Sequence, residues 1–374
     1  MFSLLSLFLL VGCDSVPPVE SQYQLGNVDL GNFQKATISS GFRHSAAITD
    51  DGVLWTWGYN GHGQLGDGTT RDRHSPVRIM DNVIAVSADS SITMAIRTDG
   101  SLWAWGRNNF GQLGDGTTID RHSPVHIMDD VIAVSTSLFH TTAIRSDGGL
   151  WVWGLNDFGQ LGDGTTIDRH SPVHIMDDVI AIYADTDITT AIRVDGSLWV
   201  WGTNFRGRLG DGTTTDRHSP VHIMDDVITV SSGMWYSAAV KSDGSLWVWG
   251  TNFASQVAGD IETEPYHPIH IMDDVAVASV GSPLMIIRTD GSLWTWNIRA
   301  IPLEDDDPEY AGWHIPVHIM DDVVAISGSW TSMALQADGS LWAWGSNWYG
   351  ELGDGTTIDR FYPAIIKTDV MLPN

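Results

Sequence analysis

D-G-S-L-W-V-W-G, at Asp243–Gly250, is the stretch around which this chain of 374 residues repeats itself. Trp247 and Trp249 lie two positions apart, so on a β-strand both side chains project from the same face. The pair occurs in seven copies, at successive steps of 48, 48, 48, 48, 47 and 48 residues: Trp55/Trp57, Trp103/Trp105, Trp151/Trp153, Trp199/Trp201, Trp247/Trp249, Trp294/Trp296 and Trp342/Trp344. A period of this length indicates a propeller, a solenoid or another array.

Each copy contains four short segments that predict strands. In the third copy these are the β-branched run Val131–Ser135, then Thr141–Arg145, Leu150–Gly154 and Pro172–Met176. The Asp-Gly pair at 147–148 is a strong hairpin signal, because glycine accepts a positive φ. Four strands per copy, Gly-rich turns and no helical period predict an all-β fold, a seven-bladed β-propeller of four-stranded blades.

The lengths of the connections predict where one blade ends and the next begins. Only Asp177 and Asp178 separate the fourth strand of the third copy from the next strand, which is typical of a hairpin within one sheet. The long connection, 156–171, is then expected to cross between blades. Each blade would hold the last strand of one copy and the first three of the next. Tyr362–Ile366 would join the strands that begin near Gln34, and this pairing of N- and C-terminal strands would close the ring.

The composition favours one large acidic body. The net charge is −27, with 46 acidic residues against 19 Lys and Arg, and 43% of the residues are apolar. An acidic surface repels phosphate groups, which argues against nucleic-acid binding and against docking on anionic lipid. We expect a monomer of one repeat domain, 33–374, in place of the several domains that the length suggests.

The N-terminus predicts a membrane anchor. Met1–Leu10 is an apolar run too short to span a bilayer and is typical of a secretory signal. Leu10-Val11-Gly12-Cys13 resembles the lipobox of bacterial lipoproteins, and the resemblance implies cleavage before Cys13 and a diacylglyceryl group on its thiol. Residues 1–12 would be the signal peptide and 13–32 the lipidated cysteine with a flexible tether. The alternative is an ordinary secretory signal with an incidental cysteine. Either way, one cysteine permits no intramolecular disulfide.

The extended motif L-W-x-W-G-x-N-x-x-G-Q-L-G-D-G, as at Leu150–Gly164, resembles the repeat of the regulator of chromosome condensation family. The resemblance runs from about Phe33 to Asn374 and implies a seven-bladed propeller. Members of that family include a nuclear guanine-nucleotide exchange factor, eukaryotic signalling proteins and bacterial secreted proteins that bind other proteins. The resemblance therefore implies a binding platform and leaves its partner open.

Three repeated motifs are interpreted as structural. The octet G-Q-L-G-D-G-T-T, first at Gly63–Thr70, has neither the lysine of a P-loop nor a following helix, so its glycines are expected to serve a tight crossing from blade to blade. Histidines four apart, such as His170 and His174, would span roughly 13 Å on a strand, too far for one zinc ion, and are expected to hydrogen-bond the long connection. The Asp-Asp pairs have turn positions, although weak calcium binding stays open.

No motif indicates catalysis, a metal site or a cofactor. A nucleophile and its base rarely occur in seven copies, and G-x-S-x-G and H-E-x-x-H are absent from the sequence. We therefore expect no enzyme, no catalytic residues, no metal and no cofactor.

Positions that differ between copies are the candidates for binding a partner. Just before the second strand the copies read F-R-H at 42–44, S-S-I at 90–92, L-F-H at 138–140, T-D-I at 186–188, M-W-Y at 234–236, G-S-P at 281–283 and S-W-T at 329–331. Equivalent loops lie on one rim of a propeller, and exposed aromatic residues anchor partners. A second variable set follows the tryptophan pairs: Tyr59, Phe110, Phe158, Phe205, Phe253, Trp348 and Tyr349. For this set we favour packing against the neighbouring blade.

The fifth and sixth copies depart most, because 254–264 and 297–313 replace the regular connection. Such departures indicate either specialisation or decay. The predicted partner-binding residues are Arg43, Phe139, Trp235, Tyr236 and Trp330 on the rim, with Tyr310 and Trp313 in the sixth copy.

We predict a non-catalytic, lipid-anchored platform in the bacterial cell envelope, facing the periplasm or exposed at the cell surface. It would bind an envelope or extracellular protein. One alternative is guanine-nucleotide exchange or cytoskeletal regulation, by family analogy. Another is an envelope glycan-binding protein or glycan-acting enzyme that uses the same aromatic residues.

Overall fold

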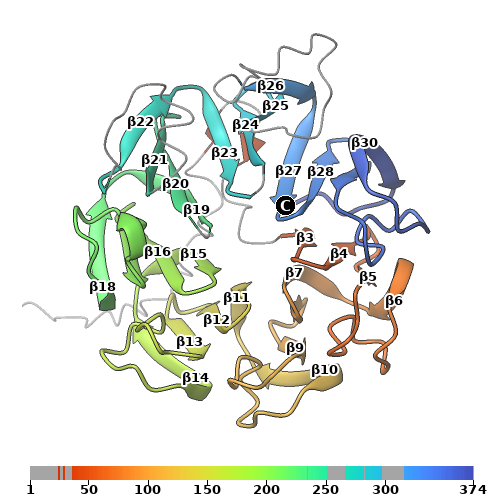
Figure 1. Ribbon diagram of the computed structural model, residues 1–374, viewed down its shortest axis with the longest axis horizontal. Coiled ribbons are helices and arrows are strands. Elements are labelled where there is room, and N and C mark those ends of the chain that lie inside the picture. The colour runs from red at the N-terminus through yellow and green to blue at the C-terminus, as the bar shows by residue number, and fades with distance from the viewer. Residues whose placement is uncertain are drawn as a thin grey trace, which may run out of the picture.

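Seven four-stranded antiparallel sheets form a closed ring around a central axis (Figure 1), which confirms the predicted seven-bladed propeller. The computed structural model describes residues 24–25, 28–29, 36–233, 235–250, 266–281, 283–296 and 316–373. A small two-stranded sheet, β1 (Gln24–Leu25) with β2 (Val28–Asp29), precedes the ring, and a 3-10 helix, η3 (Phe205–Gly207), lies in the fourth blade. In the described ranges, no helix has the length and apolar character needed to cross a membrane.

Each blade uses its strands in chain order from the axis outward. The first strands are β3 (Ile38–Ser40), β7 (Val83–Asp89), β11 (Val131–Thr136), β15 (Val179–Asp185), β19 (Val227–Ser232), β23 (Val275–Ser279) and β27 (Val323–Gly328). The second strands are β4 (His44–Ile48), β8 (Ile92–Arg97), β12 (His140–Arg145), β16 (Ile188–Arg193), β20 (Tyr236–Lys241), β24 (Leu284–Arg288) and β28 (Thr331–Gln336).

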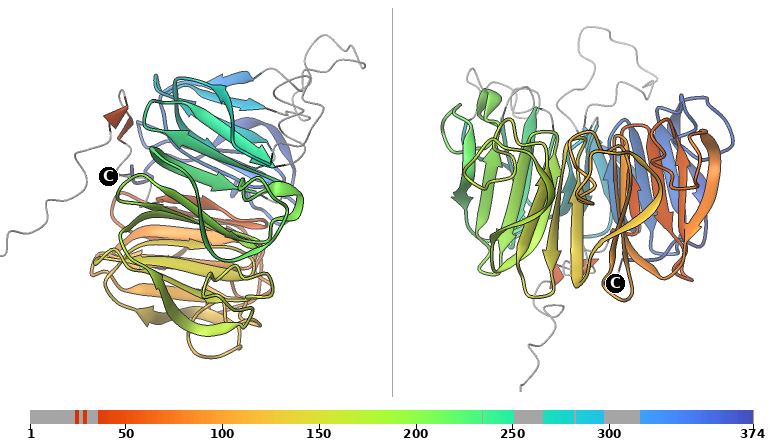
Figure 2. Two further views of the ribbon diagram at one scale, coloured as in Figure 1. Left: turned by 90° about the vertical axis from the view of Figure 1, so that its left-hand side faces the viewer. Right: turned by 90° about the horizontal axis from the view of Figure 1, so that it is seen from below.

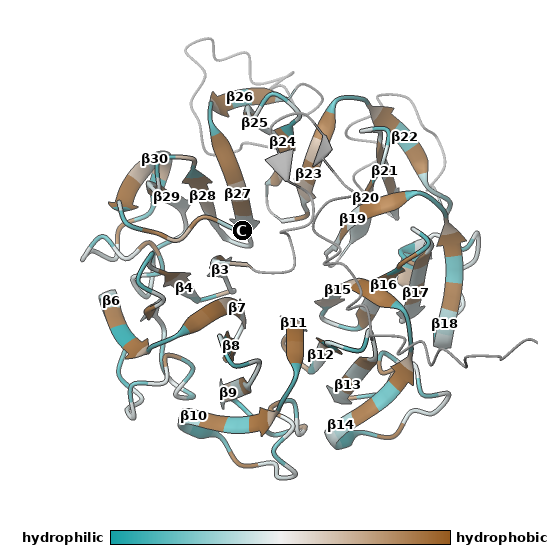
Figure 3. Cartoon of the chain, turned by 180° about the vertical axis from the view of Figure 1, so that it is seen from behind, coloured by the Kyte–Doolittle hydropathy of each residue, from teal (hydrophilic) through white to brown (hydrophobic). Residues whose placement is uncertain are grey.

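The tryptophan pairs lie on the third strand of each blade: β5 (Leu54–Gly58), β9 (Leu102–Gly106), β13 (Leu150–Gly154), β17 (Leu198–Gly202), β21 (Leu246–Gly250), β25 (Leu293–Trp296) and β29 (Leu341–Gly345). The outermost strands are β6 (Arg73–Met80), β10 (Arg121–Met128), β14 (Arg169–Met176), β18 (Arg217–Met224), β22 (Ile269–Met272), β26 (Val317–Met320) and β30 (Arg360–Lys367). Figure 3 shows hydrophilic and hydrophobic segments alternating along β14 and β18.

The second tryptophan of each pair joins neighbouring blades. Trp153 is fully buried against Met94, Ile96 and Leu102 of the preceding blade, and its indole N–H donates to the carbonyl oxygen of Gln112 at 2.9 Å. Such a side chain combines a large buried apolar area with a satisfied donor. The same indole-to-carbonyl bond recurs from Trp57 to Glu351, Trp105 to Gln64, Trp201 to Gln160 and Trp249 to Arg208.

The predicted division of the blades is wrong. Each sheet holds the four strands of a single copy, so β14 pairs with β13 and the two residues after it cross to the next blade. Asp178 adopts a left-handed backbone, with φ 61°, and the N–H of Val179 donates to the carbonyl of Gly148 at 3.0 Å. A left-handed residue turns the chain as sharply here as in a hairpin, so loop length did not distinguish the two connections.

The ring is closed by pairing between the two ends of the chain, but through other residues than predicted. The segment 362–366 lies within β30 and pairs with β29 of its own blade. The residues that follow it reach the first blade: Val370 forms a β-bridge with Thr49, and the N–H of Met371 donates to the carbonyl of Ile48 at 2.8 Å. Val370 is fully buried there and packs with Ile38. The C-terminal segment thus completes the shortened inner strand β3.

Successive antiparallel strands give the ring two different faces, seen edge-on in Figure 2. We call the face with the connections from first to second strand and from third to fourth strand the loop face. The opposite turn face carries the Asp-Gly turns, such as Asp147-Gly148, and the Asp-Asp crossings between blades. The chain enters the ring at the turn face, where the carbonyl of Thr37 accepts from the N–H of Ile48 at 2.9 Å, and the C-terminal end lies there too.

Candidate partner-binding face

The loop-face rim has the same backbone in different blades. Gly58 ends β5 with φ 106°, and a Cβ there would lie 2.6 Å from the carbonyl oxygen of Arg43. That carbonyl accepts from the N–H of Tyr59 at 2.8 Å. The equivalent bonds run from Arg107 to Ser91, Leu155 to Phe139, Thr203 to Asp187 and Ser346 to Trp330. Only glycine tolerates such a conformation at so close an approach. The backbone of the rim is therefore fixed, and its side chains are free to differ.

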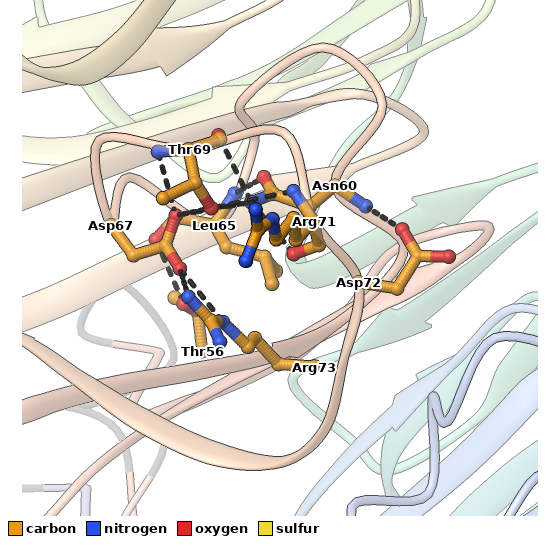
Figure 4. Close-up of polar contacts among 8 residues, drawn as sticks. All are labelled: Thr56, Asn60, Leu65, Asp67, Thr69, Arg71, Asp72 and Arg73. Carbon is orange, nitrogen blue, oxygen red and sulfur yellow. Dashed lines mark hydrogen bonds and ion pairs between the residues drawn. The ribbon is translucent and has the colours of Figure 1, made fainter.

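The long connection between third and fourth strands is organised around a buried asparagine (Figure 4). The side-chain NH2 of Asn60 donates to Oδ1 of Asp67 and to the carbonyls of Thr69 and Arg71, each at 3.1 Å, while its Oδ1 accepts from the N–H of Leu65 at 2.9 Å. The same hydrogen-bond network surrounds Asn108, Asn156, Asn204 and Asn347. The octet therefore forms a loop between two strands of one blade, so the predicted crossing from blade to blade is wrong.

An arginine completes each of these hydrogen-bond networks. Asp67 is 6% exposed and pairs with Nη2 of Arg73 at 2.6 Å. Burial opposes ionisation of this carboxyl, but the hydrogen bonds from Thr69 and Arg73 outweigh it and keep the pKa of Asp67 below its ordinary value. Asp115, Asp163, Asp211 and Asp354 have the same type of partners and the same direction of shift.

The second histidine of each predicted pair lies at the turn face, so the expectation that it bonds the long connection is wrong. Nε2 of His126 is 2.8 Å from Oδ1 of Asp129, in the two-residue crossing, and its ring packs edge-on against Trp103 with centroids 5.6 Å apart. Four more such pairs occur: His174–Asp177, His222–Asp225, His270–Asp273 and His318–Asp321. Among the described residues, no three His, Cys, Asp or Glu side chains form a group that could hold a metal ion.

The predicted rim residues differ in exposure. Trp235 and Trp330 are 45% and 56% exposed, and Arg43 and Phe139 are partly exposed. Tyr236 is only 9% exposed, because it begins β20 and lies beneath the rim with its hydroxyl 3.4 Å from the carbonyl of Gly281. Three predicted residues lie outside the described residues: Cys13, Tyr310 and Trp313.

Two further rim residues, His44 and His140, are buried between blades. Nε2 of His44 is 2.8 Å from the hydroxyl of Thr93, and Nε2 of His140 is 2.7 Å from that of Thr189. Burial lowers the pKa of His44 to about 4 and that of His140 to about 3, so both are neutral at physiological pH. These histidines stabilise the ring and do not face a partner.

An aromatic cluster spans the seam between the first and last blades. The rings of Phe42 and Trp330 are 5.1 Å apart at 72°, and those of Tyr59 and Tyr349 are 5.0 Å apart at 60°. The guanidinium carbon of Arg43 lies 5.0 Å from the centroid of Phe42, 5.3 Å from Tyr349 and 5.8 Å from Tyr59. We call these five residues the seam cluster. Four loops, two from each blade, build it.

The second variable set is divided between packing and exposure. Phe110 contacts Phe139 of the next blade edge-on, with centroids 5.6 Å apart, as the packing interpretation predicts. Phe158, Phe205 and Trp348 instead are 41%, 56% and 67% exposed. These side chains extend the aromatic surface of the loop face outward from the rim.

Sequence reasoning missed a group of charges at the inner end of the loops. Burial, followed by the charge of Asp185, raises the pKa of Asp89 to about 7. Burial also raises the pKa of Asp185, which the cation of Arg208 partly opposes. Asp89 and Asp185 occupy equivalent positions in the second and fourth copies, and the third copy has Ser137 there. Only the ring brings the second and fourth copies close enough for their charges to interact.

Comparison with known proteins identifies the repeat. A sequence model described as RCC1-like domain matches residues 18–300, and one described as Regulator of chromosome condensation (RCC1) repeat matches residues 338–371. The chain is 46% identical over 50 residues to the ultraviolet-B receptor UVR8 of Arabidopsis thaliana, covering 13% of this chain and 11% of that protein. It is 42% identical over 57 residues to the Ras guanine nucleotide exchange factor C of Dictyostelium discoideum, covering 14% and 4%.

The fold extends over nearly the whole chain. The crystal structure of human WBSCR16 superimposes with a TM-score of 0.73 at 20% sequence identity, over 84% of this chain and 94% of that one. The sequence matches, by contrast, span only about a tenth or less of the length of these curated relatives. The shared property is thus the propeller.

Proposed function

We propose that this chain, which belongs to the family of RCC1-like domains, is a non-catalytic platform that binds another protein through its loop face. The observation that carries the proposal is the rim: a fixed backbone whose side chains vary between blades, with Trp235 and Trp330 exposed among them. Exposed aromatic side chains on a rigid support lose little entropy on binding and are typical interface anchors. The turn face carries many carboxylates, which would repel an acidic partner.

We further propose that a lipid on Cys13 anchors the protein outside the cytoplasm, as the sequence pattern at 10–13 suggests. The entry of the chain at the turn face supports an orientation with that face toward the membrane. Crossing carboxylates on that face, such as Asp129 and Asp177, are 70% and 73% exposed, so anionic headgroups would repel it. A tether would hold the ring away from the lipid and direct the loop face outward.

Guanine-nucleotide exchange is the second candidate, favoured by the match to a protein named as a Ras guanine nucleotide exchange factor. This role, like cytoskeletal regulation, requires a cytosolic location. Glycan binding by the exposed tryptophans is the third. The location of the protein distinguishes the anchored platform from the exchange factor. Whether the protein binds proteins or sugars distinguishes both from the glycan-binding candidate.

Mass spectrometry of the N-terminus from the native membrane fraction tests the location. An acylated Cys13 would support the anchor, whereas an intact Met1 on cytosolic protein would favour the exchange-factor candidate. Cross-linking in native membranes tests the platform. A partner captured by the wild type and by Ile167→Ala, and lost from Trp235→Ala and Trp330→Ala, would support binding through the rim. Ile167 is the control because it is an apolar residue, 61% exposed, on an outer loop. Capture that all variants retain would contradict it.

A further inference from the structure

Arg43 holds a set of donor groups that the fold leaves unused. Nη2 of Arg73, in the same blade, pairs with Asp67 at 2.6 Å, and the equivalent arginines of other blades are paired likewise. The guanidinium of Arg43 has no hydrogen bond or ion pair within the described residues, although it is partly buried. Unlike Nε of Arg97 and Arg145, none of its nitrogen atoms is both fully buried and without a partner, so water solvates them in the free protein. A carboxylate from a partner would replace that water with charge-assisted hydrogen bonds, which are stronger than those between neutral groups.

The rings of the seam cluster orient this arginine. Three aromatic rings lie within 5.0 to 5.8 Å of its guanidinium carbon, a distance at which the cation is attracted to them. A guanidinium held among rings keeps its five N–H donors in one plane and in a fixed fork. That fork matches a carboxylate, which accepts two parallel hydrogen bonds.

The fold does not require arginine at this position. The strand registers place Ser91, Phe139, Asp187, Trp235 and Trp330 at the position of Arg43 in other blades. The carbonyl of this residue is used in the same hydrogen bond whether the side chain is Arg43, Ser91 or Phe139. Its side chain is therefore available for a role particular to the first blade.

We propose that the seam cluster is a subsite for an Asp or Glu side chain of a protein partner, received by Arg43, with an apolar neighbour of that residue packed on Trp330. The inference rests on the proposed function, because it names the chemistry by which the platform selects its partner. Trp330 is 56% exposed and contacts Phe42, so an apolar surface adjoins the arginine directly. An acidic side chain beside an apolar one would meet both features at once.

The surroundings favour a peptide carboxylate over other anions and over sugars. The charge of Arg43 is felt by Glu351, which is itself close to Asp359, so a phosphate group with nearly two negative charges would be repelled more than a carboxylate. The rings of Tyr59 and Tyr349 meet edge-on at 60° and already face the guanidinium. They do not offer the free planes on which sugar rings stack.

A library of random dodecapeptides displayed on phage, selected on the purified full-length protein in detergent, tests the subsite. We expect the enriched peptides to carry Asp or Glu beside an aliphatic or aromatic residue. The synthetic peptide that binds most tightly should lose on the order of tenfold or more in affinity for Arg43→Gln, measured by calorimetry. Arg43→Lys should recover part of the loss, because charge without the fork remains. Arg71→Gln is the matched control, since it removes an exposed charge from another loop of the same blade, and should bind as the wild type does.

A double-mutant cycle makes the contact specific. Replacing the peptide's Asp or Glu by Asn or Gln should cost the same factor against the wild type and nothing further against Arg43→Gln. Equal affinity of carboxylate peptides for Arg43→Gln and for the wild type would overturn the subsite and leave the platform standing. A library that yields no binding peptide, together with binding of the wild type to arrayed oligosaccharides, would overturn both. An unchanged melting temperature of Arg43→Gln confirms that a loss of binding is not a loss of fold.

Discussion

Replacing the buried asparagine of one loop should destabilise the whole ring. Asn108 is fully buried, and its NH2 donates to Oδ1 of Asp115 at 3.1 Å and to the carbonyls of Thr117 and Ile119 at 3.1 and 3.2 Å. Its Oδ1 accepts from the N–H of Leu113 at 2.9 Å. Four such bonds contribute about 1 kcal/mol each, and the buried N–H of Leu113 would be left without an acceptor. Asn108→Ala should therefore lower the free energy of unfolding by roughly 3–5 kcal/mol.

The neighbouring residue provides the control. Asn109 is exposed and accepts one hydrogen bond, from Nε of Arg107, so Asn109→Ala should change the free energy of unfolding by less than about 0.5 kcal/mol. Equilibrium unfolding in urea, followed by tryptophan fluorescence, measures both variants. Asn108→Asp is a sharper test: it keeps the acceptor for Leu113 but places a carboxylate against Asp115. It should be as damaging as alanine. A loss below about 1 kcal/mol for Asn108→Ala would refute the claim that this side chain organises the loop.

Three other substitutions test the closure, the buried histidines and the rim backbone. Val370→Ala should lower the free energy of unfolding by about 2 kcal/mol, because the side chain is fully buried in the first blade; Leu372→Ala, 37% exposed, should cost less than half of that in the same urea titration. Burial lowers the pKa of His140 to about 3, so as the pH falls below about 6.5 the unfolded chain takes up a proton before the folded one does. The free energy of unfolding then falls by roughly 1.4 kcal/mol per pH unit. In His140→Gln the free energy of unfolding should depend less steeply on pH between 6.5 and 4, and an unchanged dependence would contradict a neutral His140. Gly58→Ala should reduce the melting temperature more than Gly68→Ala, because both glycines have positive φ but only Gly58 has a carbonyl oxygen 2.6 Å from the added carbon.

The strands could be predicted from the sequence because each is encoded locally. Alternating apolar residues, the Asp-Gly turns and the tryptophan pairs recur in every copy, and four strands per copy with glycine-rich turns admit few architectures. The division into blades could not be predicted from loop length. The hydrogen bonds of Asn60 to Asp67 and Thr69, and that of Asp67 to Arg73, all lie within the long connection and the start of β6, as their equivalents do in other blades. They return the chain to its own blade, although the loop also accepts hydrogen bonds from the next one.

The sequence predicted which loops form the candidate site. It did not predict which side chains of those loops are exposed. His140 follows Phe139 directly, yet it is buried beneath the next blade while Phe139 lies at the surface. Tyr236 and Trp235 differ in the same way. The boundary between rim and core falls between two adjacent residues, and it is set by packing between blades that no local pattern records. The seam cluster depends on still more distant residues, since Arg43 and Tyr349 meet only when the ring closes.

The contact between blades explains why the loop face can vary without loss of the fold. Each buried indole bonds to a backbone carbonyl of the preceding loop and not to its side chain, so Gln64, Arg208 and Glu351 all serve equally as acceptors. The side chains at those positions can therefore differ in charge, although all three are buried. Glu351 uses this freedom next to the seam cluster, where burial raises its pKa and the charge of Arg43 opposes the shift. A Glu351→Gln substitution should thus preserve the ring, because the carbonyl that accepts from Trp57 remains, while it strengthens the field of Arg43 toward an incoming carboxylate.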